Sequence, residues 1–359
     1  MKQQCGTSKP RISEIELMRF AAAFIIMGHH FLFVFDKGWI LVEFFFILSG
    51  ILMAQSAEKT IQSKKQLDLG NDAKNFIIRK IKTLLPYLII AYLSYITIYL
   101  ILGGFTSTLA NDILNQIPDY LLLIDAGFNV EGYLMDDATW YISAMIIGLM
   151  ILYPIYLRLG NLGRYVVMPL IFIFCIGFLI HTGTTMNFHR QWIGFASGGM
   201  IRGIGEMALG AFCYTICTHL KKIELTTIGN IITTMMKILL ITITVIWSMG
   251  YLHTTKDFVI IFIIAGFLII MYSEKGYNIP KGSRICTYLG TLSIPIFILH
   301  RPISAAMKNF IGAEWFNENL LLAMVIVIVI SAIVVAILDY GKEHGFFERI
   351  KGIFITGNE

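Results

Sequence analysis

One stretch of the chain combines residues that could do acid–base chemistry with an apolar setting. Segment 11–31, RISEIELMRFAAAFIIMGHHF, starts with charged residues and then becomes apolar, and it carries Arg19 and His30. If the segment is helical, these two residues are about three turns apart, so they share one face at a separation of ~16 Å along the axis. An ionisable residue inside an apolar helix normally faces a protein interior or a wet cavity, which makes it a candidate functional residue.

The residues around this pair have a catalytic and a structural interpretation. A neutral imidazole at His30 is a base near neutral pH, whereas a purely structural histidine would hydrogen-bond between helices. Glu16 can pair with Arg19 three residues later and fix its rotamer, or it can simply complement the helix dipole. His29 points about 100° away from His30, so the two rings are not expected to share a small cavity. His30, Arg19 and Glu16 are therefore candidate catalytic residues, beside the structural interpretation of each.

Further polar residues in apolar stretches are candidates for binding a substrate. Arg202 and Glu206 are four residues apart, and this spacing predicts an ion pair within the membrane. Trp140 is expected at the outer boundary of its segment, where aromatic residues commonly form a belt. His300, followed by Arg301, is expected near the outer face, as an interfacial anchor or as a contact for an external substrate.

A basic segment, residues 57–83, precedes the third apolar run and contains seven lysines and arginines. Arg79 and Lys82 are three residues apart and are expected on one helix face. One interpretation is anchoring to the lipid surface. The other is an anion site suited to phosphates, with Arg79 and Lys82 as its ligands.

The composition of the chain is typical of an integral membrane protein. The chain of 359 residues is 57% hydrophobic and 14% charged, against about 25% charged residues in soluble domains. The five cysteines have no disulfide or zinc spacing, and no metal site is expected. Runs of about 20 apolar residues predict an all-α bundle of about ten transmembrane helices. The expected spans are 15–35, 39–56, 84–103, 138–157, 165–181, 198–217, 229–250, 257–273, 286–307 and 320–340.

Charge asymmetry between the loops sets the expected orientation. Loop 104–137 contains six carboxylates and no lysine or arginine, so it is expected outside, and the basic segment 57–83 is expected in the cytoplasm. Both termini are then cytoplasmic, and residues 1–359 form one membrane domain. No cleavable signal peptide is expected. The net charge of +5 reflects this asymmetry, and no nucleic-acid partner is expected.

Five segments follow one another along the chain: EIELMRFAAAFIIMGHH, FFFILSGILM, RKIKTLLPYL, WYISAMIIGLMILYPI and YLGTLSIPIFILH. With these segments in this order, the chain resembles the acyltransferase 3 family of integral membrane proteins, which includes glycan O-acetyltransferases. Two departures from the family pattern are Lys82, where the family has a second arginine, and Ile294 after Ser293, where a tyrosine is common. Lysine keeps the charge but loses bidentate phosphate binding.

The resemblance implies a membrane O-acyltransferase of the bacterial cytoplasmic membrane. It would move an acyl group, expected to be acetyl, from cytoplasmic acyl-CoA to a hydroxyl of a cell-surface glycan or lipid-linked sugar. Acetyl-CoA would be a substrate and not a resident cofactor, and membrane lipids would be the other partners. By the resemblance, His30 is the catalytic histidine, acting as a base or as an acyl carrier, and Arg79 and Lys82 hold the donor's phosphates. The competing interpretation is an exporter of a polysaccharide or its precursor, without chemistry.

Overall fold

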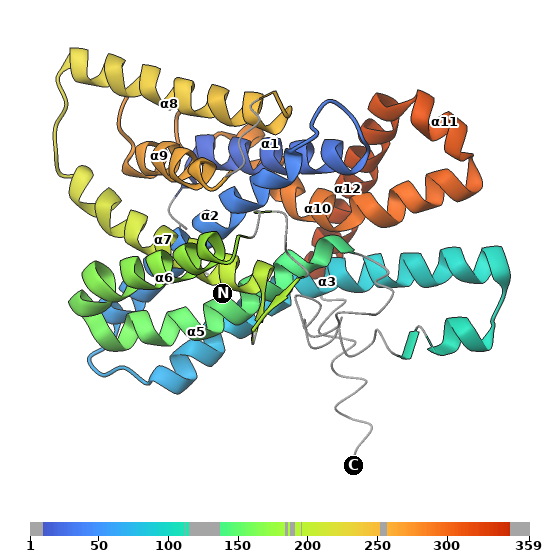
Figure 1. Cartoon of the computed structure of the whole chain (residues 1–359), viewed down its shortest axis with the longest axis horizontal. Helices are drawn as coiled ribbons and strands as arrows, with labels where there is room; N and C mark the ends of the chain where they lie inside the picture. Colours follow the sequence, from blue (N-terminus) through green and yellow to red (C-terminus); the bar gives the residue numbers. More distant parts are fainter. Residues whose placement is uncertain are drawn as a thin grey trace.

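The computed structural model shows an almost entirely helical protein (Figure 1). Its one sheet is an antiparallel pair of two-residue strands, β1 (Trp192–Ile193) and β2 (Ala196–Ser197). The structure describes residues 10–111, 113–114, 137–183, 186, 191–194, 196–251 and 257–344. Residue 112 and residues 115–136, which make up most of the predicted outer loop, lie outside this set.

The helices follow the predicted apolar runs. The long helices are α1 (Ser13–His30), α2 (Leu41–Ser63), α3 (Leu69–Gly103), α5 (Trp140–Leu162), α6 (Met168–His181), α7 (Gly198–Leu220), α8 (Thr227–Ser248), α9 (Val259–Ser273), α10 (Arg284–Phe310) and α12 (Leu320–Glu343). The short ones are the 3₁₀ helices η1 (Gly38–Ile40) and η2 (Asp137–Thr139), the π-helix η3 (Gly163–Val167), and α11 (Ala313–Glu318).

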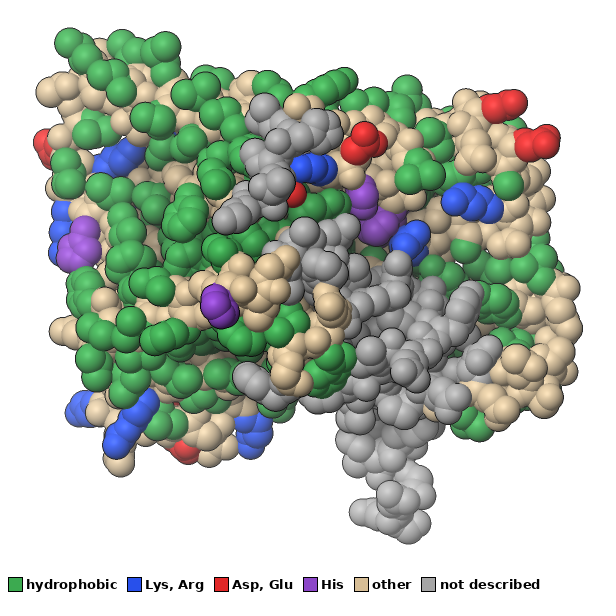
Figure 2. All heavy atoms as spheres, in the orientation of Figure 1, with side chains coloured by type: hydrophobic (Ala, Val, Ile, Leu, Met, Phe, Trp, Pro, Cys, Tyr) green, Lys and Arg blue, Asp and Glu red, His purple; other side chains and the backbone are tan. Residues whose placement is uncertain are grey.

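The all-α membrane fold is confirmed, but the count of ten spans is not. Each predicted span falls on a helix, whereas six helical stretches of the described residues are long and apolar enough to cross a membrane. Helices α5, η3 and α6 count together as one of these stretches, Trp140–His181, and α9 is apolar but shorter. Hydrophobic side chains cover much of the face shown in Figure 2, as expected of a surface in contact with lipid.

Helix α1 ends five residues before the end of the predicted span 15–35. The backbone N–H of Leu32 donates to the carbonyl of His29, and that of Phe33 donates to the carbonyl of Gly28. These two bonds form a Schellman motif, which ends helices and needs a left-handed residue, usually glycine. Here that residue is Leu32, with φ of 56° and 86% exposure. His30 is therefore the last residue of its helix.

Helices α2 and α7 make the closest backbone contact of the core. A Cβ added at Gly50 would lie 2.0 Å from the carbonyl oxygen of Met207, and one at Gly210 would lie 2.0 Å from that of Ile47. Only glycine at both positions allows this approach, as in the small-residue contacts of membrane helices. The contacts run in opposite order along the two helices, Ile47 with Gly210 and Gly50 with Met207, so they mark the point where α2 and α7 cross. This contact fixes the wall on which the cavity is built.

Candidate active site

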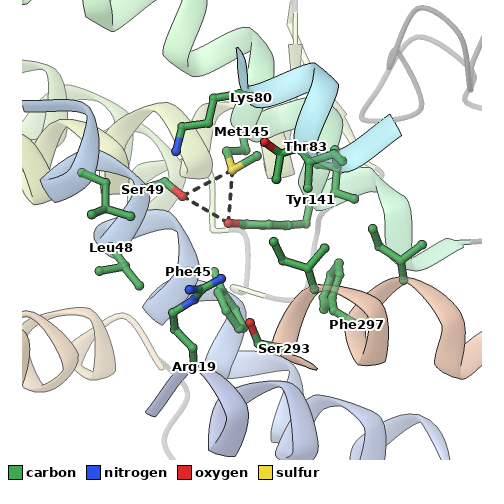
Figure 3. A pocket seen from close by; sticks show the side chains of 15 residues that line it. Arg19, Phe45, Leu48, Ser49, Lys80, Thr83, Tyr141, Met145, Ser293 and Phe297 are labelled. Carbon is green, nitrogen blue, oxygen red and sulfur yellow. Dashed lines mark hydrogen bonds between the residues drawn. The ribbon is translucent and has the colours of Figure 1, made fainter. Parts of the chain in front are cut away.

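A cavity of about 260 Å³ opens between five helices, α1, α2, α3, α5 and α10 (Figure 3). Its walls are mostly apolar, with two cations and a few hydroxyl groups. This volume is near the lower end for small-molecule sites, so it suits a narrow chain better than a whole nucleotide. The lining residues are Arg19, Phe45, Leu48, Ser49, Leu52, Lys80, Thr83, Leu84, Tyr141, Ile142, Met145, Ser293, Ile294, Phe297 and Ile298.

Arg19 is held at the cavity by the predicted pairing with Glu16. The Nη1 of Arg19 donates to Oε2 of Glu16 at 3.0 Å, and Arg11 contacts the same oxygen at 3.4 Å. Glu16 fits against the backbone of α10 at Gly290, where an added Cβ would lie 1.9 Å from Oε2. Gly290, the glycine of the segment YLGTLSIPIFILH, therefore makes room for the carboxylate that orients Arg19. The serine of the same segment, Ser293, lines the cavity.

The second cation of the cavity is Lys80, a residue not singled out from the sequence. It projects from α3 toward the space that Arg19 enters from α1 (Figure 3). Among the described residues it forms no salt bridge, and its ammonium lies 5.8 Å from the Phe76 ring centroid. Arg79 and Lys82 are exposed and do not line the cavity. Successive helical residues differ by about 100°, so a pair three apart shares one face while Lys80 faces the interior.

Hydroxyl groups and a thioether line one side of the cavity. Ser49 Oγ lies 3.3 Å from the hydroxyl of Tyr141 and 3.3 Å from the sulfur of Met145 (Figure 3). The serine belongs to the Phe-rich segment that ends in Ser-Gly, and the tyrosine to the Trp-Tyr segment. Two segments that resemble the family therefore meet at one hydrogen-bonded group in the cavity wall.

Three aromatic rings line the end of the cavity away from Lys80. The ring of Phe297 lies 5.4 Å from that of Tyr141 and 6.2 Å from that of Phe45, as centroid distances. Phe297 also lies 6.3 Å from the ring of His300, which stacks on His30 at 5.0 Å. Neither histidine lines the cavity in the described part of the chain. The cavity is therefore connected to His30 through the rings of Phe297 and His300.

His300 is fully buried, which differs from both of its expected roles at the outer face. Its Nδ1 lies 2.8 Å from the carbonyl oxygen of Phe297 and 3.1 Å from that of Ile296. Carbonyls only accept, so Nδ1–H donates and fixes the orientation of the ring. His29 contacts the carbonyl of Phe35 through its own Nδ1, at 3.2 Å, whereas the ring of His30 stacks on His300. The His29 and His30 ring centroids nevertheless lie only 5.1 Å apart.

Arg202 has a different partner from the one predicted. Its Nε lies 3.4 Å from Oε2 of Glu43, and no ion pair joins it to Glu206 among the described residues. Glu43 and Glu206 are both fully buried, and their two carboxyl groups lie side by side. Trp140 is 8% exposed and packs under the Arg202 guanidinium at 5.2 Å, so it is not a belt residue.

The positions of the polar residues along α1 indicate which kind of ligand the cavity could hold. Arg19 and Lys80 place positive charge at the cavity, and a ligand there would be anionic or would carry a polar group for them to bind. His30 lies ~16 Å farther along the same helix, beyond the aromatic end of the cavity. Helix α1 thus connects the cavity, at Arg19, to a half-buried imidazole at the C-terminal end of the helix. This geometry fits a long donor molecule with its reactive group at the tip.

Comparison with known proteins agrees with the features of this site. No curated protein and no solved structure matches the chain. The family model of an acyltransferase domain, acyltransferase 3, matches residues 12–340. This range includes every residue that lines the cavity, together with Glu16, His30 and His300. The chain therefore belongs to the acyltransferase 3 family and is a membrane acyltransferase.

Proposed function

We propose that the protein transfers an acyl group, acetyl in the first instance, from acyl-CoA to a hydroxyl of a cell-surface glycan or lipid-linked sugar. The observation that carries this proposal is the cavity with Arg19 and Lys80 at its walls and His30 beyond its aromatic end. The pantetheine arm of CoA is a narrow chain, which suits a cavity of about 260 Å³. The predicted topology opens this cavity to the cytoplasm.

The four basic side chains bind two different parts of the acyl-CoA. Lys80 and Arg19 contact the arm and the phosphate nearest to it inside the cavity. Arg79 and Lys82 are exposed on the same helix, where they contact the nucleotide phosphates that remain outside. Arg19 is too far from His30 for both to touch one carbonyl group, so its role is to position the donor.

The chemistry takes place at His30. Its neutral imidazole takes the proton from the acceptor hydroxyl while that oxygen attacks the thioester carbonyl, a contribution of about 10²–10⁴ in rate. The new carbon–oxygen bond forms, the carbon–sulfur bond breaks, and His30 passes the proton to the CoA thiolate. On the other route the imidazole of His30 attacks the thioester carbonyl, a carbon–nitrogen bond forms, the carbon–sulfur bond breaks and CoA leaves as its thiolate. The acceptor hydroxyl then attacks the acyl-histidine, the carbon–nitrogen bond breaks, and the hydroxyl proton passes through the imidazole to the thiolate.

The acceptor reaches His30 from the outer side. Trp140, Arg202 and Glu206 are buried, as is His300, so they support the walls of the acceptor site instead of lining it. His300 stacks directly on the reacting imidazole and holds it in place. On the predicted topology the protein spans the bacterial cytoplasmic membrane and modifies its acceptor on the outer face.

Donor binding to the purified protein in nanodiscs tests this proposal. We expect the wild type and His30→Ala to bind acetyl-CoA, and Lys80→Gln to bind it at least about tenfold more weakly, because a charge-assisted contact is lost. Thr83→Val, on the same cavity wall, is the matched control that keeps the charge. Transfer to a glycan acceptor must fail in His30→Ala.

Two results would contradict the proposal. Transfer that survives His30→Ala with normal donor binding would remove both routes through the histidine. If the wild type bound no acetyl-, succinyl- or longer acyl-CoA, export without chemistry would become the better explanation.

A further inference from the structure

We infer that Phe297 sets the longest acyl chain the enzyme accepts, and that its ring restricts the donor to short acyl groups. The inference rests on the proposed function, because it places an acyl-CoA in the cavity. It identifies a specificity-determining residue that lies on the path from the donor site to the reacting imidazole.

The position of the ring carries the argument. Phe297 lines the cavity and is 7% exposed. It contacts Tyr141 edge-on, and it lies next to Phe45 from the facing helix α2. These three rings meet from α10, α5 and α2, so they form a wall across the end of the cavity (Figure 3).

The far side of the same ring faces the histidines. Phe297 lies 6.3 Å from His300, and His300 lies 5.0 Å from His30. The backbone carbonyl of Phe297 accepts the Nδ1–H of His300 at 2.8 Å, so the residue is fixed from both its ring and its backbone. An acyl chain that extends past the thioester toward His30 meets this ring first.

The physical consequence is steric. Protein interiors are close-packed, and each additional methylene that has no space forces side chains away from their rotamers. A thioester with a one-carbon tail needs only a small displacement of Phe297 to reach His30. A longer tail has to displace the ring together with Tyr141 and Phe45, whose rings pack against it.

The test is a comparison of acyl-CoAs of increasing chain length. Wild type, Phe297→Leu and Phe297→Ala are assayed for binding and for transfer with acetyl-, butyryl- and hexanoyl-CoA. One methylene in a pocket changes kcat/KM by about 10–200-fold. We therefore expect the hexanoyl-to-acetyl ratio of kcat/KM to rise at least about tenfold in Phe297→Ala and by a smaller factor in Phe297→Leu.

Leu52→Ala is the matched control. Leu52 also lines the cavity, but it lies seven residues from Phe45 along α2, about 10 Å from the aromatic wall. This variant enlarges the other end of the cavity, so the hexanoyl-to-acetyl ratio is expected to stay within about twofold of wild type. Phe297→Leu keeps an apolar side chain in the core, so it tests the inference even if Phe297→Ala does not fold.

Each outcome separates the inference from the proposed function. If wild type transfers acetyl groups and both Phe297 variants keep its chain-length ratio, the inference is wrong and the proposed function stands. A ratio that shifts equally in Leu52→Ala would also overturn it, because any enlargement would then suffice. If wild type binds no acyl-CoA, both fail.

Discussion

The buried salt bridge between Glu43 and Arg202 leads to a prediction that differs from the one made by pairing Arg202 with Glu206. Glu43→Gln leaves the Arg202 guanidinium, 4% exposed, without its salt-bridge partner in the described residues. Removing one member of a buried pair costs about 3–5 kcal/mol of unfolding free energy. Arg202 keeps a hydrogen bond to the Met186 carbonyl and its contact with the Trp140 ring, so we expect the lower end, about 3 kcal/mol.

Glu206→Gln is the matched comparison. Glu206 is as buried as Glu43 but forms no salt bridge with Arg202 among the described residues. The amide keeps the volume of the side chain and leaves the salt bridge between Glu43 and Arg202 in place, so we expect a cost below about 1 kcal/mol. The two variants differ only in which acid is replaced by an amide.

Reversible unfolding in mixed micelles measures both free energies. The double variant Glu43→Leu/Arg202→Met should be more stable than Glu43→Gln, because apolar residues of similar volume can replace a buried pair. Equal costs for the Glu43 and Glu206 variants would refute the reasoning, since the two acids would then share the guanidinium. A cost confined to Glu206→Gln would show that the sequence-based pair with Arg202 is the right one.

Three further substitutions test the helices that position the site, each by unfolding in the same micelles. Gly210→Ala should cost more than about 2 kcal/mol, because its Cβ would lie 2.0 Å from a backbone oxygen of α2. The control Gly177→Ala has open space and should gain about 0.5–1 kcal/mol; equal effects would contradict the close contact. Lys237→Met should cost about 3–5 kcal/mol, because it leaves Glu14 buried without the ammonium at 2.8 Å, and a cost below 1 kcal/mol would argue against that pair. Leu32→Gly should stabilise by about 0.5–1 kcal/mol by relieving the left-handed backbone, and a loss of stability would contradict the Schellman motif.

Local features of the fold and site were predictable because they depend on neighbours in sequence. Apolar runs of about 20 residues gave the helices. The pairing of Glu16 with Arg19 is confirmed, since residues three apart on a helix meet regardless of tertiary structure. The end of α1 was not predictable, because Leu32 occupies a position where glycine would have marked the stop.

Features that depend on tertiary packing were not predictable. The partner of Arg202 comes from another helix, and nothing in the sequence favours Glu43 over the nearer Glu206. To predict that Lys80 points into the cavity, one would have to know how α3 is rotated about its own axis. The pattern of apolar residues defines this rotation poorly, because one face of the helix meets lipid and the other meets the core, and both are apolar. Arg79 and Lys82 were identified because they are three residues apart, whereas no spacing pattern singles out Lys80.

The glycine contact between α2 and α7 restricts how the cavity can open. Two helices whose backbones touch at Gly50 and Gly210 have no side-chain layer in which to slide, so they move as one rigid body. That body carries Ser49 and Phe45, which makes one wall of the cavity stationary. Helix α10 is held to α1 in a similar way, because Glu16 fits against its backbone at Gly290. Widening of the entrance therefore falls to α3, and a donor would be admitted by tilting of this helix against the fixed pair.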